Sequence, residues 1–128
     1  MLNQTAIYAV RAMGFLAKQP PGKMVLSSRI ASEMGIPRNF LSKILNRLAQ
    51  AGLIVTTRGR SGGVALARRA SGILLNDVVQ LFMQMNDYKQ CFLKSSKCDG
   101  KCGLHLRWRI ITEQFEQMLN DTTVDQIF

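Results

Sequence analysis

The sequence predicts a mainly α-helical fold with a small β-hairpin wing, namely a winged helix-turn-helix followed by a long dimerisation helix. Three observations support this prediction. Apolar residues recur every three or four positions through most of the chain, a glycine-rich turn joins two short strand-like runs, and basic residues gather in the first half. With 128 residues, 47% of them hydrophobic, the chain is long enough to bury a core.

Two helices are predicted in the first quarter of the chain. Residues 4–18 carry one apolar stripe and end at a Pro-Pro-Gly turn. A second, shorter helix is expected over residues 28–34, with Ser27 or Ser28 as its cap and Gly35 at its end. The stripe of the first helix consists of Ala6, Val10, Met13 and Ala17.

The next predicted helix has one apolar face and one polar face. Pro37 opens it near the first turn, where a missing N–H is tolerated, and Gly52 ends it. The apolar face consists of Leu41, Ile44, Leu45 and Leu48. The polar face consists of Asn39, Ser42, Lys43, Asn46, Arg47 and Gln50. An ordinary solvent-facing helix would include acids, so this acid-free face favours contact with DNA.

A β-hairpin is predicted after this helix. Residues 53–57 and 64–66 form its strands, and the turn between them is rich in glycine and carries Arg58 and Arg60. In a winged helix, the second helix of the pair enters the major groove and the hairpin reaches phosphates or the minor groove. Solvated loop charges are the alternative for the two arginines, but the preceding helix pair favours DNA. The predicted DNA-binding residues are Ser28, Arg38, Asn39, Ser42, Lys43, Arg47, Arg58, Gly59 and Arg60.

The net charge of +9 is distributed unevenly. Residues 1–70 contain eleven Lys or Arg and a single acid, Glu33, which gives +10, whereas residues 71–128 contain six basic and seven acidic residues, which gives −1. Neutralisation of phosphates with release of counterions makes such a basic half a partner for nucleic acid. We therefore expect residues 1–70 to bind double-stranded DNA and residues 71–128 to have a different role. A basic surface without a partner is the alternative.

The second half is predicted to contain two helices. An amphipathic helix follows the hairpin over residues 75–85, and a long helix spans roughly residues 103–120. The apolar residues of the long helix alternate at four and three positions, as in a helix–helix seam. A core helix of a monomer would look similar, but DNA-binding proteins of this size usually act as symmetric dimers on two half-sites. The predicted dimerisation residues are Leu104, Trp108, Ile111, Phe115 and Met118.

All three cysteines and the single histidine lie in one short segment with the pattern Cys91-x6-Cys98-x3-Cys102-x2-His105. Thiolates bind zinc and iron–sulfur units, and a neutral imidazole can complete the set. An odd number of cysteines and no export signal argue against a disulfide framework and for reduced thiols in a cytoplasmic protein.

Three chemistries are open to this segment. An iron–sulfur cluster is favoured, with [2Fe–2S] ahead of [4Fe–4S] because [2Fe–2S] clusters tolerate histidine ligands. Zinc is an alternative as a Cys3His site, although a Cys-x2-Cys knuckle is missing. A thiol switch without metal is the third, since Lys94, Lys97 and Lys101 could lower thiol pKa values or equally offset the charge of a cluster. For His105, a packed or exposed imidazole is the alternative to ligation.

These features together resemble the IscR, NsrR, RirA and CymR family of winged-helix regulators (the Rrf-two superfamily), in particular its cluster-binding branch. The resemblance covers essentially the whole chain, and its most specific string is Arg58-Gly59-x-x-Gly62-Gly63-x-x-Leu66. The other matching strings are residues 8–13, 40–48 and 51–54, the segment with the three cysteines, Trp108-Arg109 and residues 123–127.

The resemblance implies a homodimer that binds an imperfect palindrome, with a cluster beside the dimer interface that responds to redox state, iron or nitric oxide. In IscR-like members a histidine three residues after the last cysteine can be the fourth ligand, and His105 matches it. In NsrR-like members the fourth ligand is an acid near the N-terminus, where this chain has Ile7, which cannot coordinate. The cysteine spacing departs from that of the subfamilies, so cluster type and signal stay open.

Other function classes fit less well. The sequence shows no nucleophile with a paired base and no phosphate-binding loop, so neither an enzyme nor a small-molecule substrate is expected. No apolar run is long enough to cross a membrane. A winged helix that binds only proteins is the closest rival, but it would tolerate acids on the polar helix face. Repression is the expected mode, because a small dimer can occlude a promoter.

Overall fold

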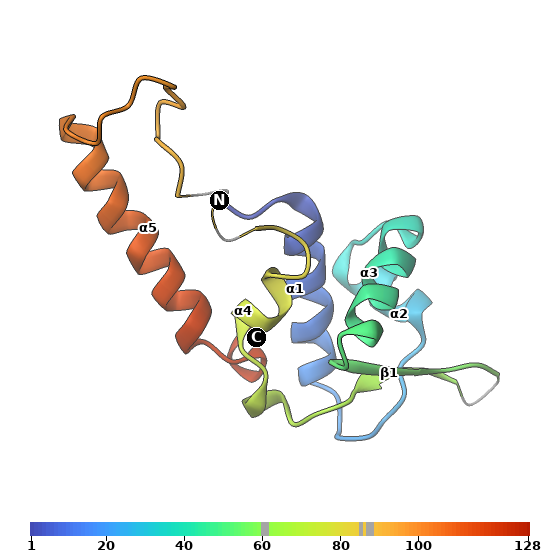
Figure 1. Cartoon of the computed structure of the whole chain (residues 1–128). Helices are drawn as coiled ribbons and strands as arrows, with labels where there is room; N and C mark the ends of the chain where they lie inside the picture. Colours follow the sequence, from blue (N-terminus) through green and yellow to red (C-terminus); the bar gives the residue numbers. More distant parts are fainter. Residues whose placement is uncertain (60–61, 85, 87–88) are drawn as a thin grey trace.

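The structure is a computed structural model that describes residues 1–59, 62–84, 86 and 89–128. It is mainly helical with one two-stranded antiparallel sheet, as predicted (Figure 1). In chain order the elements are α1 (Gln4–Ala17), α2 (Ser27–Met34), α3 (Arg38–Gln50), β1 (Ile54–Thr57), β2 (Gly63–Leu66), the 3-10 helix η1 (Ala70–Gly72), α4 (Leu75–Val79), α5 (Gly103–Asp121) and the 3-10 helix η2 (Val124–Gln126).

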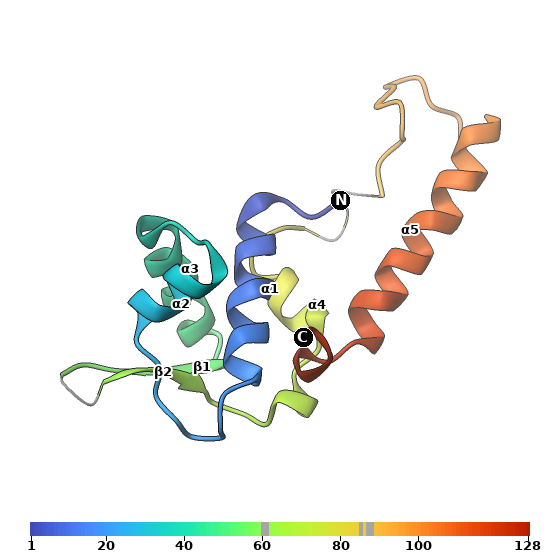
Figure 2. The ribbon, with the colours of Figure 1, turned by 180° about the vertical axis from the view of Figure 1, so that it is seen from behind.

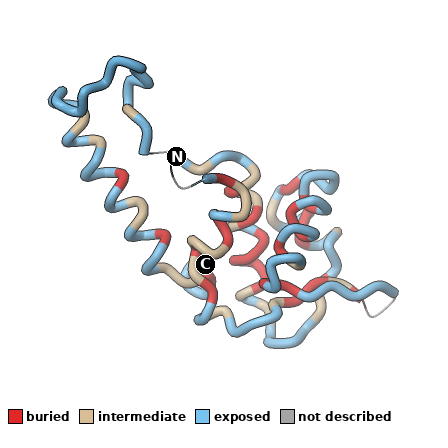
Figure 3. The backbone as a smooth tube through the Cα atoms, viewed as in Figure 1, coloured by how far each residue is buried: buried red, intermediate tan, exposed pale blue. Residues whose placement is uncertain are grey.

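The core forms around α1, which packs against α2, α3 and α4. Asn3 caps α1, because its side-chain oxygen accepts a hydrogen bond from the Ala6 N–H at 2.8 Å. The predicted apolar face of α3 is buried against this helix, with Leu41 and Leu48 at 2% and 0% exposure. Figure 3 shows the buried residues concentrated in this part of the molecule. Their burial fixes α3 so that its polar face is turned to solvent.

The wing is tied to the helices by a third strand-like segment. β1 and β2 pair in antiparallel register, with Val55 opposite Ala65, and Val25 forms a bridge to Val64 through hydrogen bonds of 2.7 and 2.8 Å. Gly63 has φ +144°, and a Cβ there would lie 2.6 Å from the Val25 carbonyl oxygen. A glycine is therefore required where the loop before α2 crosses the wing.

Two sequence predictions differ from the structure. The cap of α2 is neither Ser27 nor Ser28, because the helix begins at Ser27 and the extended residue before it is Leu26. The helix predicted over residues 75–85 is too long, since α4 covers Leu75–Val79 and is followed by a turn in which the Phe82 and Met83 N–H groups both donate to the Val79 carbonyl. The Phe82 carbonyl accepts a hydrogen bond from the Asn3 side chain instead of continuing a helix. Met85, which completed the predicted stripe, lies outside the described residues.

Helix α5 leaves the body of the molecule at its C-terminal end and projects away from it (Figures 1 and 2). At that end Leu119 is fully buried in a cluster with Ala6, Leu75 and Val79. The chain then returns to the core, where the Val124 N–H donates to the Ile73 carbonyl at 2.9 Å. Core packing thus joins residues from both predicted segments, and the boundary at residue 70 stays a prediction. Among the described residues, no helix is long and apolar enough to span a membrane.

Candidate nucleic-acid interface and cysteine site

The polar face of α3 is exposed as the sequence predicted. Arg38, Asn39, Ser42, Lys43 and Arg47 all lie on the solvent side of the helix. Within the part of the chain that the structure describes, the three basic residues of this set form no ion pair, so their charge is available to a partner. The Ser42 hydroxyl donates to the Arg38 carbonyl at 3.1 Å but keeps its acceptor lone pairs.

Ser28 belongs to the corner between α2 and α3 rather than to the open surface. It is half-buried and lines a pocket of about 110 Å³ together with Ser27, Arg38, Leu41 and Ser42. The structure therefore brings Ser28 close to two of the predicted α3 residues. Contact of these residues with DNA stays a prediction.

The wing extends from the body beside α3 (Figure 1). Arg58 and Gly59 are exposed, and Gly59 has a left-handed φ of +101° that favours glycine. The Gly62 N–H donates a hydrogen bond to the Gly59 carbonyl. A Cβ at Gly62 would lie 2.5 Å from the Thr57 carbonyl oxygen, so this position requires glycine. The third predicted wing residue, Arg60, lies outside the described residues.

An aromatic contact at the start of α3 was missed by the sequence reasoning. Phe40 is 47% exposed, and its ring lies 6.1 Å from that of Tyr8 on α1, with the Arg11 guanidinium 5.8 Å from the Tyr8 centroid. The three side chains place an apolar and a basic group next to the predicted DNA-reading residues. An aromatic residue on a helix face that is otherwise polar was the available signal.

The cysteine segment is brought together in pairs. Cys98 Sγ lies 4.0 Å from His105 Nδ1, and Cys102 Sγ caps α5 by accepting the His105 backbone N–H at 3.3 Å. Cys91 lies close enough to Cys98 for each thiol to shift the pKa of the other. All three thiols are free of disulfides. Among the described residues, no three acidic, cysteine or histidine side chains converge as a preformed metal site.

The surroundings separate the pKa values of two of these thiols. Backbone hydrogen bonds from Ser95 and Leu93 lower the pKa of Cys91. The backbone hydrogen bond from Gly100 lowers the pKa of Cys98, but the hydrogen bond with Cys91, burial and the neighbouring thiolates together outweigh it, so that pKa is raised. A low-pKa thiol therefore lies beside a high-pKa one.

One pair of the predicted ligands has a spacing that suits a metal ion. Two ligands of one tetrahedral zinc ion lie about 3.5 Å apart, given Zn–S and Zn–N bonds of about 2.3 and 2.0 Å. The 4.0 Å between Cys98 Sγ and His105 Nδ1 is close to that spacing. Residues 92–102, which follow Cys91, are exposed, so this loop can change its path when Cys98 and Cys102 bind the same centre as Cys91.

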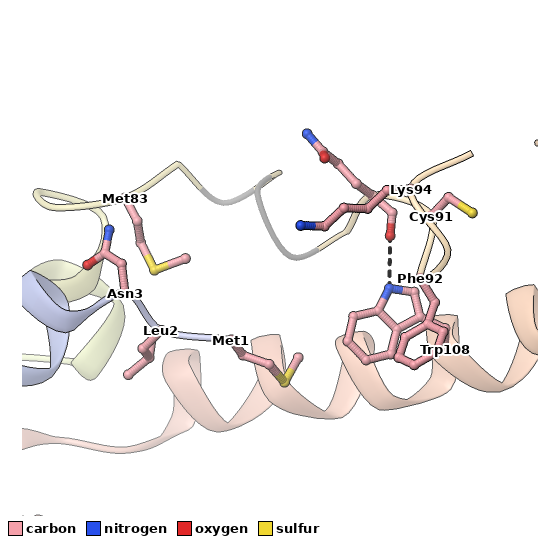
Figure 4. Close-up of a pocket in the computed structure, with 9 residues that line it drawn as sticks. Met1, Leu2, Asn3, Met83, Cys91, Phe92, Lys94 and Trp108 are labelled. Atoms are coloured by element: carbon pink, nitrogen blue, oxygen red, sulfur yellow. Dashed lines mark hydrogen bonds between the residues drawn. The ribbon is translucent and has the colours of Figure 1, made fainter. Parts of the chain in front are cut away.

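The segment before this loop is anchored on α5. The Trp108 indole N–H donates to the Gln90 carbonyl at 2.9 Å, and the Phe92 ring lies 5.2 Å from the Trp108 ring (Figure 4). Lys89 forms a 2.8 Å ion pair with Glu116, which lies about two helical turns after Trp108. Neither Gln90 nor Phe92 carried a signal in the sequence that would have identified it as part of the site.

The predicted dimerisation stripe is largely uncovered in the single chain. Leu104, Ile111 and Met118 are 45%, 49% and 46% exposed, while Trp108 and Phe115 are half-buried. Within α5 only Thr112 and Leu119 are buried. Association through this stripe stays a prediction.

Comparison with known proteins identifies the chain as a transcriptional regulator. Residues 2–128 match the model of the Rrf2 family, described as "Iron-dependent Transcriptional regulator". A curated relative from Aquifex aeolicus, named as an HTH-type transcriptional regulator, is 29% identical over 131 residues, which cover 99% of this chain and 90% of the relative. Both descriptions are of transcriptional regulators and not of enzymes.

Solved structures share the fold. The global cysteine regulator CymR of B. subtilis has a TM-score of 0.80 at 20% identity, covering 99% of this chain and 95% of its own. IscR of T. potens has a TM-score of 0.74 at 23% identity, covering 97% and 82%. CymR of Staphylococcus aureus in its oxidized form has a TM-score of 0.74 at 22% identity, covering 97% and 92%. These likenesses confirm the predicted winged-helix fold.

Proposed function

Because the chain belongs to the Rrf2 family of DNA-binding transcriptional regulators, we propose that it is a cytoplasmic homodimeric repressor whose cysteine segment holds an iron–sulfur cluster. The dimer binds a pseudo-palindromic site and responds to redox state, iron or nitric oxide. The observation that carries this proposal is the pairing of Cys98 with His105 at the N-terminus of α5, the helix that Cys102 caps and that has the uncovered apolar stripe.

DNA recognition follows from the two basic elements. α3 presents Asn39, Lys43 and Arg47 to the major groove, and the wing brings Arg58 to phosphates or the minor groove. Side chains on α3 carry the sequence preference, whereas the wing supplies affinity that depends on salt. The absence of acids from the α3 face favours DNA over a protein partner.

Cys91, Cys98 and Cys102 would hold the cluster, with His105 as the fourth ligand. When bound, an iron–sulfur cluster supplies a redox-active group that is sensitive to oxidants and nitric oxide. The combination of three thiolates and one imidazole favours a [2Fe–2S] cluster, and a [4Fe–4S] cluster is the alternative. Cys102 caps α5 and His105 lies in its first turn, so ligation there constrains the start of this helix.

Helix α5 would couple ligation in the cysteine segment to DNA binding. Two copies of this helix packed by their apolar stripes would set the spacing of the two α3 helices, and half-sites lie one helical turn of DNA apart. A change in ligation at residues 91–105 that moves α5 therefore alters DNA affinity. We expect loss or reduction of the cluster to reorder residues 88–104, of which Tyr88 lies outside the described residues.

The test compares DNA affinity with and without cofactor. We expect wild-type protein purified without oxygen to change its affinity for a duplex selected from a random pool when the cofactor is removed, and Cys98→Ala protein to show one affinity in both preparations. Affinity should also fall steeply with salt. A wild-type protein with the same affinity in both preparations would refute cluster-controlled binding.

Thiol-based sensing without a cluster is the second candidate, and a specific contact favours it. Cys91 has a lowered pKa and lies close enough to Cys98 for each thiol to shift the pKa of the other, an arrangement that suits attack of a thiolate on an oxidised neighbour. A metal-free protein that gains a reversible Cys91–Cys98 disulfide and loses DNA binding on oxidation would establish this candidate. Zinc bound by the same residues, as a structural clamp, is the remaining alternative.

A further inference from the structure

The anchoring of the cysteine segment on α5 is concentrated on one side chain. Gln90 and Phe92 flank Cys91 in the sequence, and both contact Trp108, the first through its carbonyl and the second through its ring (Figure 4). The indole therefore holds the backbone on either side of a proposed ligand. Dimerisation, the role expected for Trp108 from its spacing, does not account for these two contacts.

Little else in the described residues can replace the indole. Pockets of about 410 and 360 Å³ both include Gln90 and Trp108 in their walls, so the contact bridges a gap between the segment and the helix. The nearby Lys89–Glu116 pair is 41% and 32% exposed, and pairs of that kind contribute little. Phe92 is itself 55% exposed and would lose its one aromatic neighbour in the described structure.

We propose that Trp108 is a positioning residue that holds Cys91 in place for ligation. The inference deepens the proposed function, since it assigns this role at the same site. The affinity of a site for a metal ion depends on how well its ligating side chains are positioned before the ion binds. Residues that orient a ligating side chain typically contribute about 10–100-fold to this affinity. Trp108 acts through the backbone next to Cys91 and is not itself a ligand.

The position of Trp108 also connects the ligand to the uncovered stripe of α5. Trp108 follows Leu104 by four positions and precedes Ile111 by three on the same helix face, while its N–H reaches the cysteine segment. Release of Cys91 would remove the restraint on Gln90 and Phe92, and the indole would then be free to repack against a partner helix.

The test is a double-mutant cycle with cobalt(II) as probe, on metal-free, reduced full-length protein. Cobalt–thiolate absorption reports binding. We expect Trp108→Phe, which keeps a ring but lacks the N–H, to weaken cobalt binding about 10-fold, and Trp108→Leu to weaken it further. In a Cys91→Ala background, the same two substitutions should change the affinity less than twofold, because the residue that Trp108 positions is gone.

Ile111→Ala is the matched control, since Ile111 is 49% exposed on the same stripe. It should leave the affinity for cobalt within twofold of the wild-type value while weakening the association of two chains through α5. Equal losses for Trp108→Phe with and without Cys91 would overturn the inference, and so would a wild-type chain that does not bind cobalt. Iron content and DNA affinity play no part in this cycle, so a failure of the proposed cluster function would be seen separately.

Discussion

Lys43 and Arg58 carry the same charge but are placed for different tasks. Lys43 lies on the exposed face of α3, and Arg58 lies in the wing next to Gly59. The polar face of α3 was predictable because its apolar residues alone decide which side is buried. The Tyr8–Phe40–Arg11 contact was not predictable, because it depends on how α1 crosses α3.

Substituting these two residues should separate the preference for particular DNA sequences from the affinity for DNA of any sequence. We expect Lys43→Ala to change the ranking of DNA sequences by about 1–3 kcal/mol at one base position. Arg58→Ala should weaken binding to all sequences and reduce the slope of log K against log salt by about 1. Fluorescence anisotropy over a range of salt concentrations measures both. Arg107→Ala, an exposed charge on α5, is the control, and unchanged binding by both test variants would contradict the docking model.

The two thiols with shifted pKa values should differ in reactivity. Because the pKa of Cys91 is lowered and that of Cys98 is raised, Cys91 carries more thiolate at neutral pH in the metal-free protein. As the pH rises, labelling of Cys91 by iodoacetamide should reach its half-maximal rate at a lower pH than labelling of Cys98. Mass spectrometry of quenched samples gives both profiles. Superimposed or reversed profiles would disagree with the structure.

At the scale of elements, α1, α3 and the hairpin follow from local patterns, whereas α4 does not. The apolar spacing over residues 75–85 continues beyond Val79, where α4 ends, and the Phe82 carbonyl accepts a hydrogen bond from the distant Asn3 side chain. The bridge between Val25 and Val64 was equally hidden, because no local pattern relates a loop residue to a strand so far along the chain. Both failures come from contacts between distant segments, which override local propensity.

The bridge at the wing makes a sharp prediction about Gly63. Gly63→Ala places a Cβ 2.6 Å from the Val25 carbonyl oxygen at a φ of +144°, so we expect a loss of about 1–3 kcal/mol in the free energy of unfolding. Urea denaturation measures the loss. Gly72→Ala is the matched control, since nothing lies within 4 Å of its Cβ position, and it should change stability by less than about 0.5 kcal/mol. Equal stabilities for the two variants would contradict the wing geometry.

At the scale of the whole molecule, α5 is the element whose role the single chain leaves open. It was predictable as a long amphipathic helix, and its stripe is exposed along most of its length (Figure 3). The cysteine segment runs directly into the N-terminus of α5, and we propose that this helix connects the cysteine segment with a partner chain. The convergence of Trp108 with Gln90 and Phe92 could not be predicted, because it depends on the path of the loop.

Association through α5 can be tested with a charge. We expect Ile111→Glu to convert a dimer into a monomer in sedimentation experiments, because a carboxylate would be buried without a partner in the seam. DNA affinity should then fall at least about 10-fold, since one subunit engages only one half-site. Gln117→Glu adds the same charge at an exposed position away from the stripe and should leave the dimer intact. A dimeric Ile111→Glu protein would rule out this interface.

The most direct test of the central claim is metal and sulfide analysis, with an absorption spectrum, of the full chain purified without oxygen. We expect iron and acid-labile sulfide together with a broad visible band, and loss of all three in Cys98→Ala protein. A colourless protein with about one zinc per chain, or one without metal even after anaerobic reconstitution, would contradict the assignment of Cys91, Cys98, Cys102 and His105 to a cluster.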